Sequence, residues 1–382
     1  MRVLHLLDSL NRGGAETLAL DVCRNARAAG LELTFAATGG GELEDDFRRS
    51  GAHFIRLSRR APLDPKLVGQ LRRLIEERAV EVVHCHQAVE ALHAYLATRG
   101  RGRVAGNRVK RVLSFHLCTA DAKNRLALKF LAPRMDWNVA VSRELLACLG
   151  AEGGFETARN FQVVYNGVDA ARVQQEATAG ARQLLRLELK LAEGDLLLGM
   201  VGNFYADARK DQLTVCRALP AVFQRAPNAH FAFAGGCVGA DATRIYQECV
   251  DYCREQGIAA RVHFLGQRRD VADILRALDI FVFSSRRDSF GVAVVEAMLA
   301  GVPAVVSDIG ALLEVTRGGE FASVFRTGDA DDLARRLSEL VEDGARRERL
   351  ADAARVWASR EFGIETHLAN LLKLYKSPAG VP

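Results

Sequence analysis

No apolar run in this chain approaches the roughly 20 residues that a membrane-spanning helix requires. The first apolar stretch already ends at Asp8, so we expect a β-strand there rather than a signal peptide. None of the eight cysteines belongs to a CxxC pair, and Cys249 and Cys253, four residues apart in an expected helix, have no accompanying pair of histidines. This cysteine usage predicts reduced thiols and a cytoplasmic protein.

The sequence also shows no repeat of roughly 20–50 residues. Its 382 residues, 49% of them hydrophobic and 26% charged, suffice for two globular domains. Short β-rich runs alternate with longer amphipathic ones, which is typical of a doubly wound α/β sheet. We expect strands over 3–7, 32–36, 53–56, 82–84, 112–115, 137–141, 162–164, 196–201, 230–234, 262–265, 280–283 and 304–306. The expected helices include 15–29, 66–78, 346–360 and 365–376.

The net charge of +5 is unevenly distributed along the chain. Residues 1–168 carry 25 Lys or Arg against 18 Asp or Glu, a net charge of +7, which leaves −2 for the remainder. The excess peaks over 99–111, where six basic residues occur without an acid. A solvated loop explains such a run. The alternative is a surface that meets anionic lipid headgroups or a phosphorylated acceptor.

The mixed basic and apolar segment 123–131 supports this second interpretation of the basic run. It predicts that the N-terminal domain touches a membrane peripherally. Nucleic acid is not an expected partner, because aromatic residues are not interleaved with the charges.

Two acids frame the most informative segment of the chain. Asp288 precedes a Ser-Phe-Gly turn and an apolar helix, and that helix carries the second acid, Glu296, before Gly301 and Pro303 end it. Free N–H groups at a helix N-terminus attract phosphate. Carboxylates accept hydrogen bonds from sugar hydroxyls. The pattern therefore indicates a site for a polyhydroxylated ligand with an anionic part.

The segment 284–314 resembles the acid-x7-acid signature of the retaining glycosyltransferases of family 4, which have the GT-B fold. The resemblance implies that Asp288 contacts hydroxyls of the donor sugar and that Glu296 binds the ribose. The family usually has Glu where this chain has Asp288, so its carboxylate reaches one methylene less far. Further donor-binding residues implied by the signature are Ser289, Phe290, Gly291 and Val292, the last three through backbone groups that stabilise the leaving group.

Two stretches of the N-terminal half resemble the same family. Gly13 and Gly14 open a helix after the first strand, where backbone amides can approach a diphosphate or the acceptor. A third glycine at the offset of the dinucleotide-binding fingerprint is missing. His116, at the end of a strand, matches the histidine that contacts the donor sugar near its anomeric centre. The alternative is a histidine bonded only to neighbouring loops.

The C-terminal half contributes the expected cations. Lys210, at the start of a helix, matches the family's diphosphate-binding lysine. The family often has Arg where this chain has Asn203, and we expect Arg209 to supply the missing charge. Gly266 and Arg268 resemble the loop that borders the nucleobase. Between the halves, residues 164–169 resemble the family's NGVD linker and read as a turn.

Two further patterns suggest a metal only weakly. His84 and His86 lie on one face at a strand end and would need a carboxylate, but the sequence places no third ligand. Asp329 and Asp331 mimic a DxD motif but read better as the start of a helix. GT-B enzymes generally work without a bound metal, so the resemblance implies no metal and no cofactor.

The resemblance implies an α/β protein of GT-B fold with two facing Rossmann-like domains. We expect an acceptor-side domain over 1–168, a nucleotide-sugar-binding domain over 169–360, and a helix over 361–382 that crosses back to the N-terminal domain.

The implied reaction transfers a hexosyl unit, with anomeric retention, from a nucleotide sugar to a hydroxyl acceptor such as a growing glycan or a lipid-linked saccharide. UDP-sugars are favoured and GDP-mannose is the alternative. The implied location is cytoplasmic, with peripheral contact at the inner membrane face. Two other interpretations stay open: a nucleotide-sugar epimerase of the same fold, and a non-catalytic nucleotide-sugar-binding scaffold.

Overall fold

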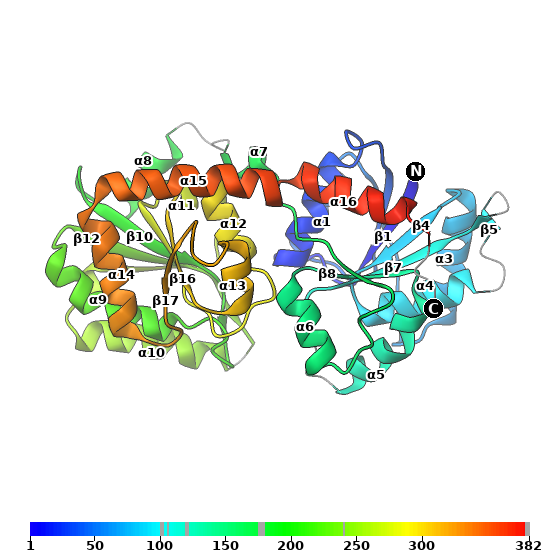
Figure 1. Cartoon of the computed structure of the whole chain (residues 1–382), viewed down its shortest axis with the longest axis horizontal. Coiled ribbons are helices and arrows are strands. Elements are labelled where there is room, and N and C mark those ends of the chain that lie inside the picture. Colours follow the sequence, from blue (N-terminus) through cyan, green and yellow to red (C-terminus); the bar gives the residue numbers. More distant parts are fainter. Residues whose placement is uncertain (100–102, 105–106, 119–121, 175–179, 240, 379–382) are drawn as a thin grey trace. The chain divides into compact units, whose positions relative to one another are not determined.

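The computed structural model describes residues 1–99, 103–104, 107–118, 122–174, 180–239 and 241–378. It divides into two compact units, each of which is described by itself: Met1–Val168 with Phe362–Pro382, and Asp169–Glu361 (Figure 1). Part of the basic run, including Arg101, lies outside the described residues, as does 175–179 after the expected linker.

The first unit is built on a parallel seven-stranded sheet in the order β3-β2-β1-β4-β7-β8-β9. Register pairs His5 of β1 with His84 of β4, so these two side chains are neighbours on one face. The strands are β1 (Arg2–Leu7), β2 (Glu32–Ala37), β3 (His53–Arg56), β4 (Val82–Cys85), β7 (Lys110–Phe115), β8 (Trp137–Ala140) and β9 (Phe161–Val163), with a separate antiparallel pair, β5 (Arg103–Val104) and β6 (Asn107–Arg108).

Helices cover both faces of this sheet (Figure 1). They are α1 (Gly14–Asn25), α2 (Glu44–Arg48), α3 (Pro65–Glu77), α4 (Ala88–Thr98), α5 (Ala122–Leu131), the 3-10 turn η1 (Ala132–Arg134), α6 (Arg143–Ala151) and the C-terminal α16 (Ile364–Lys376). Helix α16 packs beside α1 and shares its core, in which Phe35 and Tyr375 are fully buried. The apolar stripe of α16 therefore completes the core of the first unit.

The second unit has a parallel six-stranded sheet in the order β14-β12-β10-β15-β16-β17. Its strands are β10 (Leu196–Val201), β12 (Ala229–Ala234), β14 (Val262–Gly266), β15 (Ile280–Phe283), β16 (Ala304–Ser307) and β17 (Ser323–Phe325), and a short parallel pair is formed by β11 (Phe204–Tyr205) and β13 (Cys237–Val238). Its helices are α7 (Ala170–Gln174), α8 (Ala181–Glu188), α9 (Gln212–Arg225), α10 (Ala242–Glu255), η2 (Ala259–Arg261), α11 (Val271–Ala277), α12 (Val292–Leu299), α13 (Gly310–Val315), α14 (Ala330–Glu342) and α15 (Gly344–Phe362).

Two parallel sheets flanked by helices confirm the predicted fold class. Every expected strand is present, with bounds within two residues of the prediction. Asp329 is the N-cap of α14, where its side chain accepts a hydrogen bond from the backbone of Asp332 at 2.9 Å, so this segment is a helix start. Within the described residues, none of the helices is both long and apolar enough to cross a bilayer.

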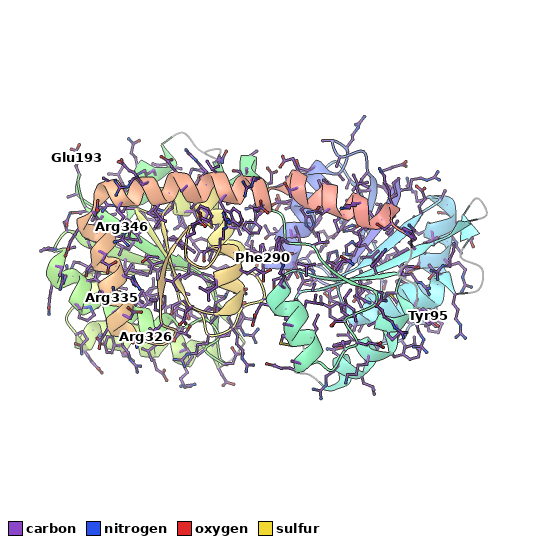
Figure 2. The ribbon with its side chains drawn as sticks, in the orientation of Figure 1. Tyr95, Glu193, Phe290, Arg326, Arg335 and Arg346 are labelled. Carbon is purple, nitrogen blue, oxygen red and sulfur yellow. A yellow bond between two sulfur atoms is a disulfide. The ribbon has the colours of Figure 1, made fainter. Side chains whose placement is uncertain are left out.

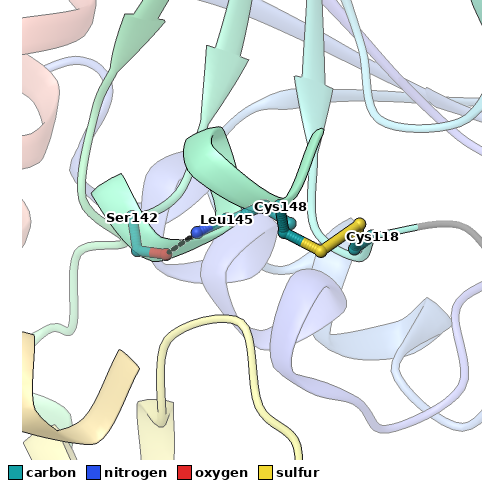
Figure 3. Close-up of a disulfide and its surroundings, with 4 residues drawn as sticks. All are labelled: Cys118, Ser142, Leu145 and Cys148. Atoms are coloured by element: carbon teal, nitrogen blue, oxygen red, sulfur yellow. Dashed lines mark hydrogen bonds between the residues drawn. A yellow bond between two sulfur atoms is a disulfide. The ribbon is translucent and has the colours of Figure 1, made fainter. Parts of the chain in front are cut away.

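The prediction of reduced thiols is wrong for one pair of cysteines. Cys118, after β7, and Cys148, in α6, form a disulfide with Cα atoms 6.1 Å apart (Figure 3). Ser142 caps α6 and accepts a hydrogen bond from the Leu145 backbone at 2.9 Å, which sets the helix so that Cys148 faces the loop after β7. A separation of 30 residues without a motif gave no sequence signal. Because disulfides are typical of oxidising compartments, the cysteines no longer support the cytoplasmic prediction.

Candidate functional site

The centre of the second unit's site is an ion pair between Lys210 and Asp288. The bridge between Lys210 and Ser285 holds the segment before α9 against the loop after β15. The Lys210 ammonium donates a hydrogen bond to Asp288 and lies 4.1 Å from the centroid of the Phe283 ring. Both charged side chains are largely buried, with 14% and 18% of their surface exposed. A pair so shielded from water interacts more strongly than a surface pair.

The environment of Asp288 keeps its carboxyl group ionised. Burial alone would raise its pKa, but the charge and hydrogen bond of Lys210, together with two backbone N–H groups, outweigh burial and hold the pKa below its usual value. One Asp288 oxygen accepts from the backbone of Phe290 at 3.0 Å and of Gly291 at 2.9 Å. Two of the three amides predicted to bind the leaving group are therefore engaged by Asp288 in this structure.

Glycine is needed at the turn that starts α12. Gly291 has a positive φ of 91°, and a Cβ there would lie 2.6 Å from a methyl group of Leu312. Phe290, labelled in Figure 2, is buried next to this turn. The turn therefore places Val292 at the first position of the helix and brings the amide-rich N-terminus next to Asp288.

Glu296 lies in the second turn of α12 and has its own cationic partner. Its carboxylate accepts a hydrogen bond from the Arg172 guanidinium at 2.9 Å, and only 10% of its side chain is exposed. Arg172 belongs to α7 of the same unit. The sequence gave no reason to connect these residues, which are 124 positions apart. The two acids of the signature are thus both paired with a base.

Asn203, which replaces the family's usual arginine, holds two loops together. Its side-chain oxygen accepts a hydrogen bond from the backbone of Gly236 at 3.0 Å. Arg209, the expected substitute cation, is bound to both carboxylate oxygens of Asp207 at 3.0 Å and lies over the Tyr205 ring. Its charge is therefore already neutralised locally, although 40% of the side chain is exposed.

The loop after β14 contains the residues expected to border the nucleobase. Gly266 has a positive φ of 63°, and a Cβ there would meet open space. Arg268 is held between Asp270 and Glu188, with its closest contacts at 2.7 Å. This double pairing fixes the guanidinium plane at the edge of the loop.

In the first unit, the predicted glycines mark the start of α1. Gly13 is the N-cap residue, and a Cβ added to it would lie 2.5 Å from the Glu16 carboxylate. Burial raises the pKa of Glu16, and the hydrogen bond from its own backbone N–H opposes that rise. An acid therefore occupies the helix N-terminus to which Gly13 and Gly14 were assigned as anion contacts.

His116 follows β7 and is part of a cluster that the sequence revealed only in part. Its Nε2 lies 2.9 Å from Nδ1 of His86, and the His84 and His86 rings are stacked with centroids 4.8 Å apart. The residues that sequence reasoning missed are His5 and Tyr375, which lie in β1 and α16. His5, His84 and His86 each have one potential ligand atom within 4.8 Å of the others. The third histidine, His5, comes from the neighbouring strand β1, which is far from β4 in the sequence.

Comparisons with known proteins identify the family. The model described as Glycosyltransferase Family 4 matches residues 12–172, and the model described as Glycosyl transferases group 1 matches residues 195–343. Together the two models span most of the chain, which therefore belongs to the glycosyltransferases that they describe. The predicted family and fold are therefore confirmed.

Individual relatives agree with this assignment. The chain is 24% identical over 380 residues to phosphatidyl-myo-inositol mannosyltransferase of Mycobacterium leprae, covering 96% of this chain and 94% of that protein. It is 24% identical over 322 residues to N-acetyl-alpha-D-glucosaminyl L-malate synthase of Bacillus anthracis, covering 82% of this chain and 79% of that protein. Anabaena HepE, solved with UDP and glucose, is similar in fold, with a TM-score of 0.83 at 20% identity and coverage of 99% and 100%.

Proposed function

We propose that this glycosyltransferase is a retaining hexosyltransferase that uses a nucleotide sugar and a hydroxyl acceptor. A UDP-sugar is the favoured donor and GDP-mannose the alternative, and the acceptor is a growing glycan or a lipid-linked saccharide. The observation that carries the proposal is the shielded ion pair of Lys210 with Asp288 beside the N-terminus of α12. The mannosyltransferase activity in one relative's name and the UDP bound to HepE support this choice of substrates.

In the proposed mechanism the donor replaces the contact between Lys210 and Asp288. The ammonium group turns to the diphosphate and neutralises the charge that grows as the sugar leaves. The freed carboxylate of Asp288 accepts hydrogen bonds from sugar hydroxyls, and His116 of the first unit orients the same sugar. The acceptor attacks from the face that the diphosphate leaves, and a phosphate oxygen takes the acceptor's proton, so the configuration is retained.

The remaining donor contacts follow from the second unit's loops. Glu296 binds the ribose, the loop with Gly266 and Arg268 borders the base, and Ser289 and the N-terminus of α12 contact the sugar and phosphates. Arg209 contributes only if the donor displaces Asp207. Gly13 and Gly14 of the acceptor-side unit contact the reacting groups once Glu16 moves aside. The proposal includes no cofactor, because Lys210 supplies the cationic stabilisation.

Incubation with radiolabelled UDP- and GDP-sugars tests the proposed reaction against its two rivals. Slow hydrolysis of one donor, and transfer when a hydroxyl acceptor is added, is the expected result. Recovery of an altered nucleotide sugar would instead identify an epimerase. Tight binding without turnover of any donor would identify a scaffold. Anomeric analysis of the transferred sugar decides retention.

Replacing Glu296 with Gln is expected to weaken donor binding by about 1.5–3 kcal/mol, because ribose hydroxyls lose a charged acceptor. The dissociation constant should rise about 10- to 150-fold. Calorimetric titration with the preferred donor measures it. The melting temperature must be recorded as well, because Arg172 also loses its partner.

Glu348→Gln is the matched control for this substitution, since Glu348 is an exposed acid in α15 of the same unit. It should leave donor affinity and melting temperature unchanged. Donor affinity that is unaltered in folded Glu296→Gln would remove Glu296 from the site.

The proposed membrane contact is centred on α5 and the residues next to it. Leu126, Phe130 and Leu117 expose 73%, 46% and 60% of their surface, whereas the expected apolar contacts Leu128 and Leu131 are buried in the unit. The basic residues of the preceding run are not all available either. Arg108 pairs with Asp136, and Lys110 donates to the carbonyl groups of Tyr375 and Ser377 at the C-terminal end of α16. Both therefore have structural roles.

The double substitution Lys129→Gln, Arg134→Gln is therefore expected to reduce binding to anionic vesicles. Each cation near such a surface contributes about 1 kcal/mol, so the loss should be about 30-fold at low salt. Co-sedimentation at low and high salt measures it, since screening acts within about 10 Å at 0.1 M salt. Arg244→Gln, Arg254→Gln, at exposed positions of α10, is the charge-matched control. If the unaltered protein does not pellet with the vesicles at low salt, the proposed membrane contact and the inner-face location are both rejected. A soluble acceptor is then the better proposal.

A further inference from the structure

A continuous chain of hydrogen bonds crosses the first unit and ends at His116. Ser114 Oγ lies 2.7 Å from His84 Nε2, and His84 Nδ1 lies 2.6 Å from the Tyr375 hydroxyl. The same hydroxyl is 3.1 Å from His5 Nε2. His5 Nδ1 is then 3.4 Å from His86 Nε2, and His86 Nδ1 is 2.9 Å from His116 Nε2. Six side chains from β1, β7, α16 and the ends of β4 and β7 are thus linked in series.

The four histidines in this series of hydrogen bonds are neutral. Burial lowers the pKa of His5 to about 3 and of His116 to about 4, and it lowers the pKa values of His84 and His86 well below the usual value. His367 lies close enough to lower all four further, and its own pKa is about 4 because it is buried. A neutral imidazole has one N–H and one bare nitrogen, so each ring donates in one direction and accepts in the other.

Counting protons leaves only two possible directions for the whole series of hydrogen bonds. Each of the six groups supplies one proton, and each of the five contacts accommodates one. If two neighbours donated toward each other, two protons would meet, and if both pointed away, two lone pairs would meet. One further arrangement, in which the Tyr375 hydroxyl accepts from both His5 and His84, would leave the buried Tyr375 proton without an acceptor among the described residues, which is costly. All six groups therefore donate in the same direction, either toward His116 or toward Ser114. The state of His116 is thereby tied to a hydroxyl group five contacts away.

Ser114 decides between these two directions. Its hydroxyl is buried, with 5% exposure, and within the described residues its only hydrogen-bond partner is His84. If the chain ran toward Ser114, this hydroxyl proton would be buried without an acceptor, which is costly. The serine proton therefore goes to His84 Nε2, and each following group donates onward. His116 Nε2 accepts from His86, so the His116 proton is on Nδ1.

We propose that Ser114, His84, Tyr375, His5 and His86 are positioning residues that fix His116 as its Nδ1–H tautomer, so that it presents a hydrogen-bond donor to the ligand. Within the described residues Nδ1 of His116 has no hydrogen-bond partner, so its N–H group is available to a ligand. The inference deepens the proposed function: an N–H group at this position would bind a sugar hydroxyl oxygen, whereas the opposite tautomer would present a lone pair. The mechanism needs no change in the charge of His116.

A metal ion is the alternative occupant of the histidine cluster, and the ring geometry disfavours it. His84 and His86 are stacked with only 11° between their planes. A metal lies in the plane of each ring that binds it, and two parallel planes share no such position. Both nitrogens of His84 are also already bonded to Ser114 and Tyr375. The hydrogen-bonded chain therefore accounts for these rings better than a ligand set.

Nitrogen NMR of protein labelled with 15N-histidine tests the tautomer directly, without reference to activity. The His116 signals are assigned as those lost in His116→Asn. The expected pattern is a protonated Nδ1 and a bare Nε2 at pH 7. A His116 proton on Nε2 would overturn the inference, as would a saturable Zn²⁺ site, seen by titration with the metal alone, that disappears in His86→Gln.

Two substitutions of Ser114 test whether this residue sets the direction in which the hydrogen bonds are donated. Ser114→Thr retains the hydroxyl and should keep the Nδ1–H tautomer, whereas Ser114→Ala should give a mixture of both tautomers. For the preferred donor, Ser114→Ala should lower turnover about two- to tenfold through loss of one neutral hydrogen bond, and Ser114→Thr should restore it. An unchanged tautomer in Ser114→Ala would contradict the role of Ser114. If the unaltered protein turns over no nucleotide sugar, the proposed function fails. The NMR measurement of the His116 tautomer still tests this inference, because it does not depend on activity.

Discussion

Replacing Lys210 with Ala is expected to lower the turnover number with the preferred donor about 10²- to 10³-fold, while donor binding weakens much less. One positioned group that stabilises charge in the transition state is typically worth about 2.7–4 kcal/mol. The ammonium group of Lys210 is largely buried against Asp288 and Phe283, so water cannot easily replace it. Asp288 keeps its two backbone hydrogen bonds in the variant, so the turn before α12 should persist.

Steady-state kinetics with the labelled donor, in parallel with calorimetric binding, separate these two effects of Lys210→Ala. Arg244→Ala is the control, because Arg244 is an exposed cation of the same unit whose pair with Glu248 contributes little to stability. Its kinetics should match those of the unaltered protein. If Lys210→Ala raises the dissociation constant and leaves the turnover number unchanged, Lys210 only holds the ground state.

The fold could be predicted because its signals are local. Alternation between β-rich runs and amphipathic stretches located β10 and β15 to the residue. The strand β17, Ser323–Phe325, was not predicted. The pairs β5 with β6 and β11 with β13 are only two residues per strand, below the length that any pattern can mark.

The candidate site could be predicted only where it follows motifs. The motifs identified Lys210 and Asp288 separately, but their mutual pairing depends on the bridge at Ser285. Residues such as Arg172 and Tyr375 carry no local signal, because their partners lie 124 and 370 positions away along the chain. In the same way, a single histidine in the apolar strand β1 indicates nothing until register places it beside His84. These contacts are products of topology and could not be found from the sequence.

The buried histidines also predict that the first unit loses stability in mild acid before the second. Five of them, His5, His84, His86, His116 and His367, have folded-state pKa values below the usual value of about 6.5. The contribution of a histidine with a depressed pKa to the free energy of unfolding is fully present above pH 6.5. That stability is lost as the pH falls toward the folded-state pKa, which is about 4 for His116 and His367. The unfolded chain binds more protons throughout this window.

The expected slope is about 1.4 kcal/mol per pH unit for each proton taken up on unfolding, so several histidines together make it steep. The chain contains two tryptophans, Trp137 in the first unit and Trp357 in the second. Urea unfolding of Trp357→Phe therefore reports on the first unit, and unfolding of Trp137→Phe reports on the second. Measurements at several pH values between 7.5 and 4.5 give both slopes.

The second unit should respond less, because it has only two histidines, His230 and His263. They are half-buried with ring nitrogens 3.1 Å apart, and burial lowers the pKa values of both, so two groups contribute to its slope against five in the first unit. Within the first unit, His86→Gln should reduce the slope by about one proton, since it removes one of the groups that must be protonated on unfolding. His53→Gln is the comparison, because His53 is exposed at β3 and its pKa is lowered less far than that of His86, by slight burial and by Arg78, so the slope should fall by less. Equal slopes for both units, or a first unit whose stability stays level down to pH 5, would mean that the histidines remain charged in the fold. The proton count behind the Nδ1–H tautomer of His116 would then fail as well, because an imidazolium ring donates in both directions.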